Sequence, residues 1–438
     1  MVSSMSRLLQ NNYLAGRILD LSYGKYECRE ICEIIGSERS LERAFLWEDV
    51  QKYIEELEKE GFICVHNGIA YRNEELYITN KKQREEIGTD GVTRILWDIT
   101  RKCNLKCQHC YAYKESDFSE ELSIEQVYQT IDELREVQPY LIVFGGGEPL
   151  VRSDFVDILK YTKETLGCRT KILTNGTLLN HERLEQIRPY VDFYQLSIDG
   201  SEQAHDELRG HIGAYKKTIE TIKMLRKEGL QTGICMTIHN KNYKDIQEVI
   251  EFSLKYGVYK LRISPFVASG KAKNNFRDWM IPREELVKIY DTLAQLRLKL
   301  QNQLLLDFRD ELYGAAFIGC PGDKLKEDNN YLLCAAGRSL FYINPEGYVT
   351  PCNFIDTEQY FVGNVKEEDV SDLWFNSKLF EEYRILNVDQ IEKCSGCKRK
   401  NLCGGGLRCN ALMTTGDIKA FDPCCDFYEE ACTESKPV

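Results

Sequence analysis

Three cysteines in one short stretch constrain this chain more than any other feature. The segment WDITRKCNLKCQHCYAY, residues 97–113, contains Cys103, Cys107 and Cys110 in a CxxxCxxC arrangement. A zinc site usually takes four ligands, often from two separated pairs. Three closely spaced thiolates with no fourth nearby suit instead a cuboidal iron–sulfur cluster in which one iron lacks a protein ligand. Such an open iron can bind and reduce a small molecule.

A glycine-rich turn later in the chain supports this interpretation. The apolar run at residues 140–145 leads into GGGEP, whose last four residues are Gly146, Gly147, Glu148 and Pro149. Glycines at this point let the backbone approach a ligand closely. CxxxCxxC followed by GGEP resembles the radical S-adenosylmethionine (radical SAM) enzymes, in which this turn holds the amino group of SAM. The resemblance implies that the chain cleaves SAM to methionine and a 5′-deoxyadenosyl radical.

From residue 94 onward, apolar strands alternate with helical segments. We predict strands at 94–99, 140–145, 169–174, 192–198, 231–238 and 259–265, and helices at 123–137, 153–166, 180–188, 214–228, 243–256 and 282–301. Six βα units require a parallel sheet with helices outside, which predicts an α/β fold with a partial (β/α)6 TIM-type barrel over residues 92–305. Ligands of such sheets bind at the C-terminal ends of the strands, where the cysteine loop and the glycine turn both fall.

Further candidate residues follow the third and fourth predicted strands. The resemblance implies that Ser197 and Arg209 contact the carboxylate or ribose of SAM. It extends to Asn175 and Asp199, for which ordinary turn chemistry is a competing explanation. His109 precedes the third cysteine, where the family usually places an aromatic residue against adenine. Stacking on adenine is therefore favoured over a role as a fourth iron ligand.

A second group of cysteines lies within residues 306–438, nine of them between Cys334 and Cys432. Paired cysteines can bind zinc, and CSGCKRKNLC resembles a zinc knuckle. The whole order resembles instead the SPASM extension of radical SAM enzymes, which holds auxiliary 4Fe–4S clusters. The gap of five residues before Cys409 departs from that family's gap of three. The resemblance implies one cluster on Cys334, Cys352, Cys409 and, as the possible fourth ligand, Cys320, and another on Cys394, Cys397, Cys403 and one of the pair Cys424 and Cys425, preferably Cys425.

Residues 1–85 precede the barrel as a small domain. We predict helices at 8–21, 28–35 and 41–60, then a two-stranded hairpin turning at Asn67-Gly68, which together make a winged-helix domain. The longest helix is acidic and the chain carries a net charge of -12, which argues against a nucleic-acid partner. The domain is similar to the leader-peptide recognition elements of ribosomal-peptide maturation enzymes. That similarity implies an added peptide strand at its sheet edge, and a purely structural cap is the alternative.

Composition indicates a soluble protein of the cytoplasm. The N-terminus lacks the apolar core of a signal peptide, and no apolar run approaches the roughly 20 residues that span a bilayer. Eighteen cysteines in such a chain do not suggest a disulfide framework, which is typical of small secreted domains. Metal or cluster ligation in a reducing compartment accounts for them better.

The resemblance covers nearly the whole chain and is to peptide-modifying radical SAM/SPASM maturases. The domain order resembles that of streptide-type synthases, which join a lysine carbon to a tryptophan ring. It implies SAM and three 4Fe–4S clusters, a precursor peptide with leader and core, a carbon–carbon or thioether cross-link, and an electron donor such as flavodoxin or ferredoxin. Two alternatives stay open: an anaerobic sulfatase-type maturase of folded proteins, and a non-enzymatic, zinc-bound regulator. The sequence does not identify a catalytic base.

Overall fold

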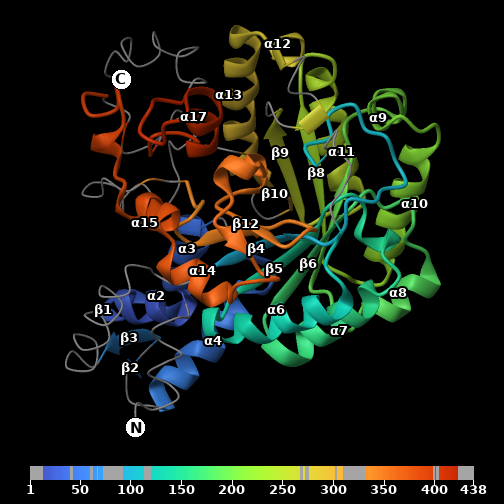
Figure 1. Cartoon of the computed structure of the whole chain (residues 1–438). Coiled ribbons are helices and arrows are strands. Elements are labelled where there is room, and N and C mark those ends of the chain that lie inside the picture. Colours follow the sequence, from blue (N-terminus) through green and yellow to red (C-terminus); the bar gives the residue numbers. More distant parts are fainter. Residues whose placement is uncertain are drawn as a thin grey trace.

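The chain folds into a small N-terminal domain, a central α/β barrel and a cysteine-rich C-terminal region (Figure 1). The computed structural model describes residues 13–39, 43–59, 63–66, 68–72, 92–112, 120–266, 270–271, 276–300, 303–308, 332, 334–397, 400 and 404–422. None of the helices in these ranges has both the length and the hydrophobicity that crossing a membrane requires.

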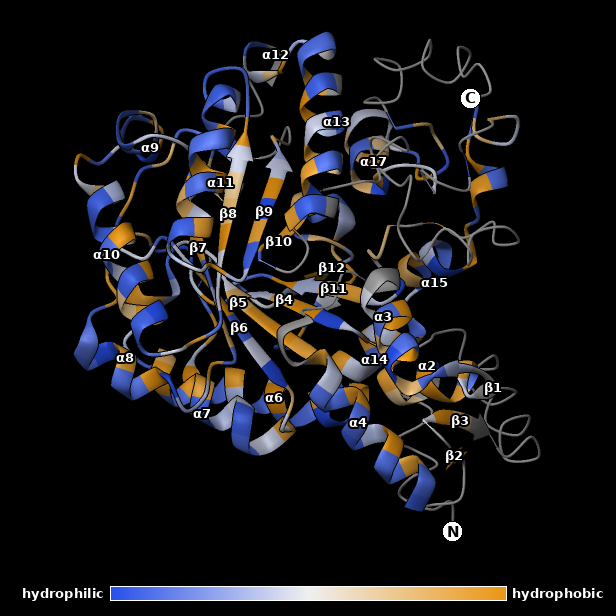
Figure 2. Cartoon of the chain, turned by 180° about the vertical axis from the view of Figure 1, so that it is seen from behind, coloured by the Kyte–Doolittle hydropathy of each residue, from blue (hydrophilic) through white to orange (hydrophobic). Residues whose placement is uncertain are grey.

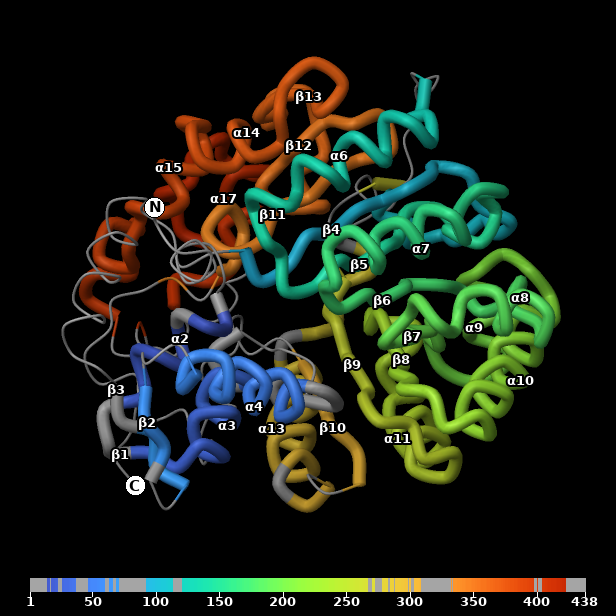
Figure 3. Tube along the Cα trace, turned by 90° about the horizontal axis from the view of Figure 1, so that it is seen from below, coloured from blue at the N-terminus to red at the C-terminus, as the bar shows by residue number. Residues whose placement is uncertain are grey.

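The barrel contains all six predicted strands, paired in parallel and in chain order. They are β4 (Arg94–Asp98), β5 (Leu141–Gly145), β6 (Arg169–Thr174), β7 (Phe193–Ser197), β8 (Thr232–Ile238) and β9 (Lys260–Pro265). Figure 3 shows the helices ranged around the outside of this curved sheet. They are α6 (Ile124–Val137), α7 (Phe155–Leu166), α8 (His181–Ile187), α10 (Ala214–Lys227), α11 (Ile246–Lys255) and α13 (Arg283–Leu300). The predicted partial barrel is confirmed.

The main core lies between this sheet and its helices. Alternate strand residues point outward, so Ile95 and Trp97 of β4 join Ile142 and Phe144 of β5 in one buried apolar cluster. Trp97 and Phe144 stack with ring centroids 6.0 Å apart. Figure 2 shows the strands largely in the hydrophobic colour and the outer helix surfaces largely in the hydrophilic one. The residues between these, such as Leu96 and Asp98, face the other side of the sheet.

The sheet extends beyond the six predicted strands at both edges, to ten strands in total. On one side β10 (Leu305–Phe308) pairs in parallel with β9. On the other side β11 (Leu340–Ile343) pairs in parallel with β4, followed by the antiparallel strands β12 (Tyr348–Thr350) and β13 (Gly363–Asn364). β11 and β12 therefore form a C-terminal hairpin that continues the barrel sheet. The C-terminal region also contains α14 (Val370–Asn376), α15 (Lys378–Ile385) and α17 (Arg408–Thr415), and a short α12 (Phe276–Trp279) precedes α13.

The described part of the N-terminal domain contains three helices and a sheet in the order β1-β3-β2. Its elements are α2 (Tyr13–Leu21), β1 (Tyr23–Glu27), α3 (Cys28–Arg39), α4 (Arg43–Lys59), β2 (Ile63–His66) and β3 (Ile69–Arg72). The prediction of a two-stranded hairpin was incomplete, because β1 adds a third strand. The sequence of β1, YGKYE, contains a glycine and two charged residues, which disfavour a strand.

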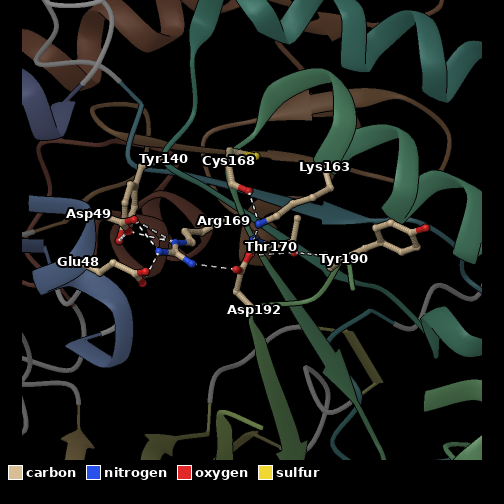
Figure 4. A network of polar contacts seen from close by, with 9 residues as sticks. All are labelled: Glu48, Asp49, Tyr140, Lys163, Cys168, Arg169, Thr170, Tyr190 and Asp192. Atoms are coloured by element: carbon tan, nitrogen blue, oxygen red, sulfur yellow. Dashed lines mark hydrogen bonds and ion pairs between the residues drawn. The ribbon is translucent and has the colours of Figure 1, made fainter. Parts of the chain in front are cut away.

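This domain packs against the N-terminal ends of the barrel strands. Leu141, Val143 and Phe193 of the barrel belong to the same buried cluster as the apolar faces of α2, α3 and α4. Around that contact, Asp49 of α4 pairs with Arg169 at 2.6 Å and accepts a hydrogen bond from the Tyr140 hydroxyl at 2.8 Å (Figure 4). The domain thus covers the end of the barrel opposite the cysteine loop.

Candidate active site

The cysteine loop that follows β4 is fastened to three neighbouring segments by backbone hydrogen bonds. One neighbour is the glycine turn after β5, the second is α9 (Glu202–Arg209), and the third is the short segment 270–271. The bonds run from Gly147 N to Thr100 O (2.7 Å), Glu148 N to Lys102 O (2.9 Å), Gln108 N to Leu208 O (2.9 Å) and Lys271 N to Cys110 O (3.0 Å). The fold therefore determines the path of the loop on both sides of the cysteines.

The structure brings the three loop cysteines to one site. Cys103 is exposed, and Cys107 and Cys110 are half-buried. The pKa of the Cys103 thiol is raised to about 11, chiefly because the sulfur is shielded from solvent; the Leu105 N–H opposes this shift, and Glu148 and the sulfurs of Cys107 and Cys110 add to it. Three sulfurs that repel one another's negative charge require a cation or a cationic cluster to hold them as thiolates.

The glycines of the turn allow the cysteine loop to lie directly against it. A Cβ atom on Gly146, whose φ is +120°, would stand 2.3 Å from the Thr100 carbonyl oxygen. One on Gly147 would stand 2.2 Å from the Lys102 carbonyl oxygen. The sequence explained these glycines by close approach to a ligand, whereas the structure shows close approach to the loop that carries the cysteines.

The Glu148 carboxylate forms hydrogen bonds within the protein. It is fully buried and accepts hydrogen bonds from the Thr174 hydroxyl (2.8 Å) and from the backbone N–H groups of Asn175 (2.8 Å) and Leu150 (3.3 Å). Burial raises its pKa to about 7, although these hydrogen bonds favour the ionised form. Glu148 therefore joins the end of β5 to the end of β6. Pro149 follows it as the first residue of η1 (Pro149–Val151).

Asp199 and Arg209 form a buried ion pair beside the cysteine loop. Arg209 Nε lies 2.7 Å from an Asp199 carboxylate oxygen, and Arg209 Nη1 lies 3.7 Å from the Cys107 sulfur. Burial alone would raise the pKa of Asp199, but Arg209, His109 and His205 lower it to about 2. An ionised Asp199 thus orients the Arg209 guanidinium toward a candidate cluster ligand.

Asn175 is tied to the same loop, and Ser197 lies nearby. The Asn175 amide donates to the Asn104 side chain at 2.9 Å, and its oxygen accepts from the Thr177 N–H at 2.9 Å. Asn175 therefore stabilises a turn through its side chain, which was the competing explanation for this residue, and it also supports the cysteine loop. Ser197 is the half-buried last residue of β7, two positions before Asp199. Their predicted contacts with SAM stay predictions.

His109 offers the clearest indication of a ligand at this site. Its ring is half-buried, and its buried Nδ1 atom has no hydrogen-bond partner within the described part of the chain. Burial lowers the pKa of His109 to about 3, so the imidazole is neutral. A neutral imidazole with an unsatisfied nitrogen fits an amino group such as that of adenine, and the three thiols fit an iron–sulfur cluster.

The C-terminal region gathers three more of the predicted ligands. Cys334 and Cys409 are buried and Cys352 is half-buried in one cluster. Burial raises the pKa of Tyr383, and the nearby sulfurs of these three cysteines raise it further. Cys409 therefore lies with its predicted partners despite the longer gap before it. Cys394 packs against the same cluster and Cys397 follows it in a turn, whereas Cys320, Cys403 and Cys425 lie outside the described residues.

Within the described ranges, no three His, Cys, Asp or Glu side chains converge closely enough to hold a single metal ion. Cysteines of an iron–sulfur cluster bind different irons and so stand further apart than the ligands of one ion. The ligand roles of these cysteines stay predictions.

A buried ion-pair junction, absent from the sequence prediction, joins the cysteine loop to the C-terminal hairpin. Arg101 pairs with both oxygens of Glu346 at 3.0 and 2.7 Å and with Asp356 at 2.7 Å. The three side chains are only 2%, 6% and 9% exposed. Asp356 follows η6 (Asn353–Ile355), the turn directly after Cys352, so the junction connects the two cysteine sites.

Asp98, also missed at the sequence level, lies beside this junction. Its carboxyl group accepts hydrogen bonds from the hydroxyls of Tyr342 (2.9 Å) and Tyr111 (3.5 Å). The one available signal was an acidic residue within the otherwise apolar end of a strand. The Tyr111 ring in turn meets the Phe354 ring edge-on, with centroids 5.9 Å apart.

Comparison with known proteins gives the family. Residues 97–253 match the radical SAM superfamily, and residues 334–398 match the iron–sulfur cluster-binding domain named SPASM. The chain is a radical SAM enzyme with a SPASM domain. SAM and iron–sulfur clusters are its cofactors, and their number stays a prediction. Cys103, Cys107 and Cys110 would hold the cluster that supplies the electron for SAM cleavage, and this ligand role stays a prediction.

Relatives of this radical SAM enzyme fall into different substrate classes. The AdoMet-dependent heme synthase of Oleidesulfovibrio alaskensis is 28% identical over 80% of this chain and 90% of its own length. The PqqA peptide cyclase of Bradyrhizobium diazoefficiens is 28% identical over 79% of this chain and 89% of its own. The solved structure of Streptococcus suis SuiB bound to precursor peptide SuiA has a TM-score of 0.64 and 18% identity, covering 86% of this chain and 89% of SuiB. That last likeness supports the fold alone.

Proposed function

We propose that this enzyme is a maturase of a ribosomally made precursor peptide. The N-terminal sheet would bind the leader, and the radical made from SAM would start a carbon–carbon or thioether cross-link in the core. A lysine–tryptophan bond is the version that the streptide-type resemblance implies. The observation that carries the proposal is the outer edge of β2 in the N-terminal domain.

The outer edge of β2 has the chemistry of a site for an added strand. Within the described residues, β2 pairs on one side only, with β3. On its other side the Val65 N–H donates to the exposed carboxylate of Glu58, at 2.9 Å. That carboxylate occupies the place of a carbonyl group from a neighbouring strand. A peptide that adds here would displace Glu58 and gain backbone hydrogen bonds.

The relatives support this choice and also define its main competitor. The similarity to a peptide cyclase is consistent with a peptide substrate. The heme synthases favour a porphyrin instead. Sulfatase-type maturases of folded proteins have no need of a leader-binding domain, so the β2 edge argues against that alternative.

Substrate-dependent SAM cleavage tests the proposal directly. The reconstituted enzyme, with SAM and dithionite, should form 5′-deoxyadenosine when given the peptide encoded by a short gene beside its own. Mass spectrometry should show that this peptide loses two hydrogens, because a cross-link replaces two X–H bonds. Consumption of an iron porphyrin, with the peptide unchanged, would contradict the proposal.

Leader recognition has its own test at Val65. Val65→Pro removes the outward N–H and places a ring at the edge, so the dissociation constant for the fluorescently labelled precursor should rise at least about tenfold. Val65→Ala keeps the N–H and is the matched control. Anisotropy titrations in which both variants bind equally would exclude this edge as the leader site.

These point changes are preferable to deletion of residues 1–85. Removing the domain would uncover Leu141, Val143 and Phe193, which are buried beneath its helices. Exposed apolar surface of that kind destabilises the barrel by itself. A loss of peptide affinity after deletion would therefore not distinguish a leader site from a structural cap.

A further inference from the structure

Asp98 occupies the C-terminal end of β4, the first strand of the barrel. Trp97 points toward the helices, so Asp98 faces the inner side of the sheet. Gly145 is its partner on β5, and a Cβ there would stand 3.0 Å from the Asp98 carboxyl oxygen. The carboxyl group thus lies beside the last residue of β5, at the end of the strands where parallel barrels carry their catalytic groups.

Two tyrosine hydroxyls orient the Asp98 carboxyl group, and carboxyl groups outnumber cations around it. Tyr342 reaches it from β11 and Tyr111 from the cysteine loop, both as hydrogen-bond donors. The charged groups that face it are Arg101 and Asp356. Arg101 already pairs with Glu346 and Asp356, so Asp98 is a third buried carboxyl group beside a single guanidinium. At 3% exposure it has little water to stabilise its charge.

We propose that Asp98 accepts the proton that the substrate loses as the cross-link forms, with Tyr342 and Tyr111 as positioning residues. This role rests on the proposed maturase activity. The 5′-deoxyadenosyl radical takes a hydrogen atom from one substrate carbon, and the resulting carbon radical adds to a second atom of the peptide. The adduct then loses one electron, taken by an auxiliary iron–sulfur cluster, and one proton, taken by the Asp98 carboxylate to give a carboxylic acid.

The titration of Asp98 suits such a role. Burial raises its pKa to about 7, opposed first by the Tyr342 hydrogen bond and then by Arg101. A base with this pKa is ionised in an increasing fraction of molecules as the pH rises through neutrality, and it can release the proton again. Cross-linked peptide per 5′-deoxyadenosine should therefore increase between about pH 6 and about pH 8.

Asp98→Asn provides the main test. Peptide-dependent formation of 5′-deoxyadenosine should continue, while cross-linked peptide per 5′-deoxyadenosine falls at least about 100-fold and no longer varies with pH. Equal ratios in the variant and the wild type would overturn the proposal. Failure of the maturase proposal looks different, because the wild-type enzyme would then form no 5′-deoxyadenosine in response to the peptide.

Tyr342→Phe tests whether protonation of Asp98 controls the product ratio. It removes the hydroxyl that donates to Asp98 and keeps the aromatic ring. Losing a donor that stabilises the carboxylate raises the pKa of Asp98, so the rise in the product ratio should move to higher pH. Tyr360→Phe, which removes a buried hydroxyl bonded to Leu412 O, is the matched control and should not move it.

Infrared spectroscopy gives a readout that does not depend on activity. The protein should show protonated carboxyl absorption that disappears as the pH rises through neutrality, and Asp98→Asn should lose part of it, leaving the part from Glu148, whose pKa is also about 7. No such absorption in the wild type, or unchanged absorption in Asp98→Asn, would contradict the assignment.

Discussion

Gly147→Ala is expected to abolish SAM cleavage and to prevent iron from binding at the Cys103–Cys110 loop. The new methyl group would stand 2.2 Å from the Lys102 carbonyl oxygen and 2.6 Å from that of Arg101, so the loop must move away from the turn. That movement breaks the backbone hydrogen bonds from Gly147 and Glu148 to the loop and displaces Cys103. A shift of about 1 Å in a catalytic site can cost about 100-fold in rate.

Iron analysis after anaerobic reconstitution should show a loss of about four irons per chain, and formation of 5′-deoxyadenosine should fall by at least about 100-fold. Gly167→Ala is the control, because Gly167 ends α7 with a φ of +60° and a Cβ there would meet nothing within 4 Å. It should lower stability by roughly 1–2 kcal/mol and keep the full iron content. A Gly147→Ala enzyme with normal iron content would show that the close contact between turn and loop is dispensable.

Arg101→Met is expected to destabilise the protein by about 3–5 kcal/mol, because it leaves Glu346 and Asp356 buried without their cation. The thermal midpoint of the apoprotein should then fall by about 3–5 °C, because a chain of 438 residues unfolds with an entropy of about 0.9 kcal/mol/K. The stability of Arg101→Lys should lie between that of the wild type and that of Arg101→Met, because one ammonium group cannot reproduce the paired contacts of the guanidinium to two carboxylates.

The triple variant Arg101→Met, Glu346→Gln, Asp356→Asn separates lost charge balance from lost packing. It removes all three charges, so much of the stability should return relative to Arg101→Met alone. Calorimetry of the four proteins makes this comparison. A triple variant less stable than Arg101→Met would mean that the junction acts through shape and hydrogen bonding rather than charge.

The barrel could be predicted because each strand is a short apolar run ended by a distinctive residue. Gly145, Asn175 and Asp199 each follow such a run, and each lies at the C-terminal end of the sheet in the structure. The same local pattern placed the cysteine loop, the glycine turn and Arg209 at one edge. Periodicity of this kind depends only on neighbours in the chain, which is why it was sufficient.

The features that could not be predicted depend on pairing between segments that are distant in the sequence. Arg101 and Glu346 are separated by 245 residues, and nothing local indicates that β11 pairs with β4 in the register that brings them together. Glu148 illustrates a related limit. The contact of its motif with SAM stays a prediction, whereas the hydrogen bonds of its carboxylate to the end of β6 involve a partner that only the folded sheet supplies.

The N-terminal domain and the cysteine loop lie at opposite ends of the barrel strands, and this separation sets a length requirement on a bound precursor. β6 has six residues, so at about 3.3 Å per residue the two ends stand about 20 Å apart. A peptide held at the β2 edge needs at least about six extended residues to reach the radical. The distance along the precursor between recognised leader and modified residue would then act as a ruler, selecting the reacting residue by its position as much as by its chemistry.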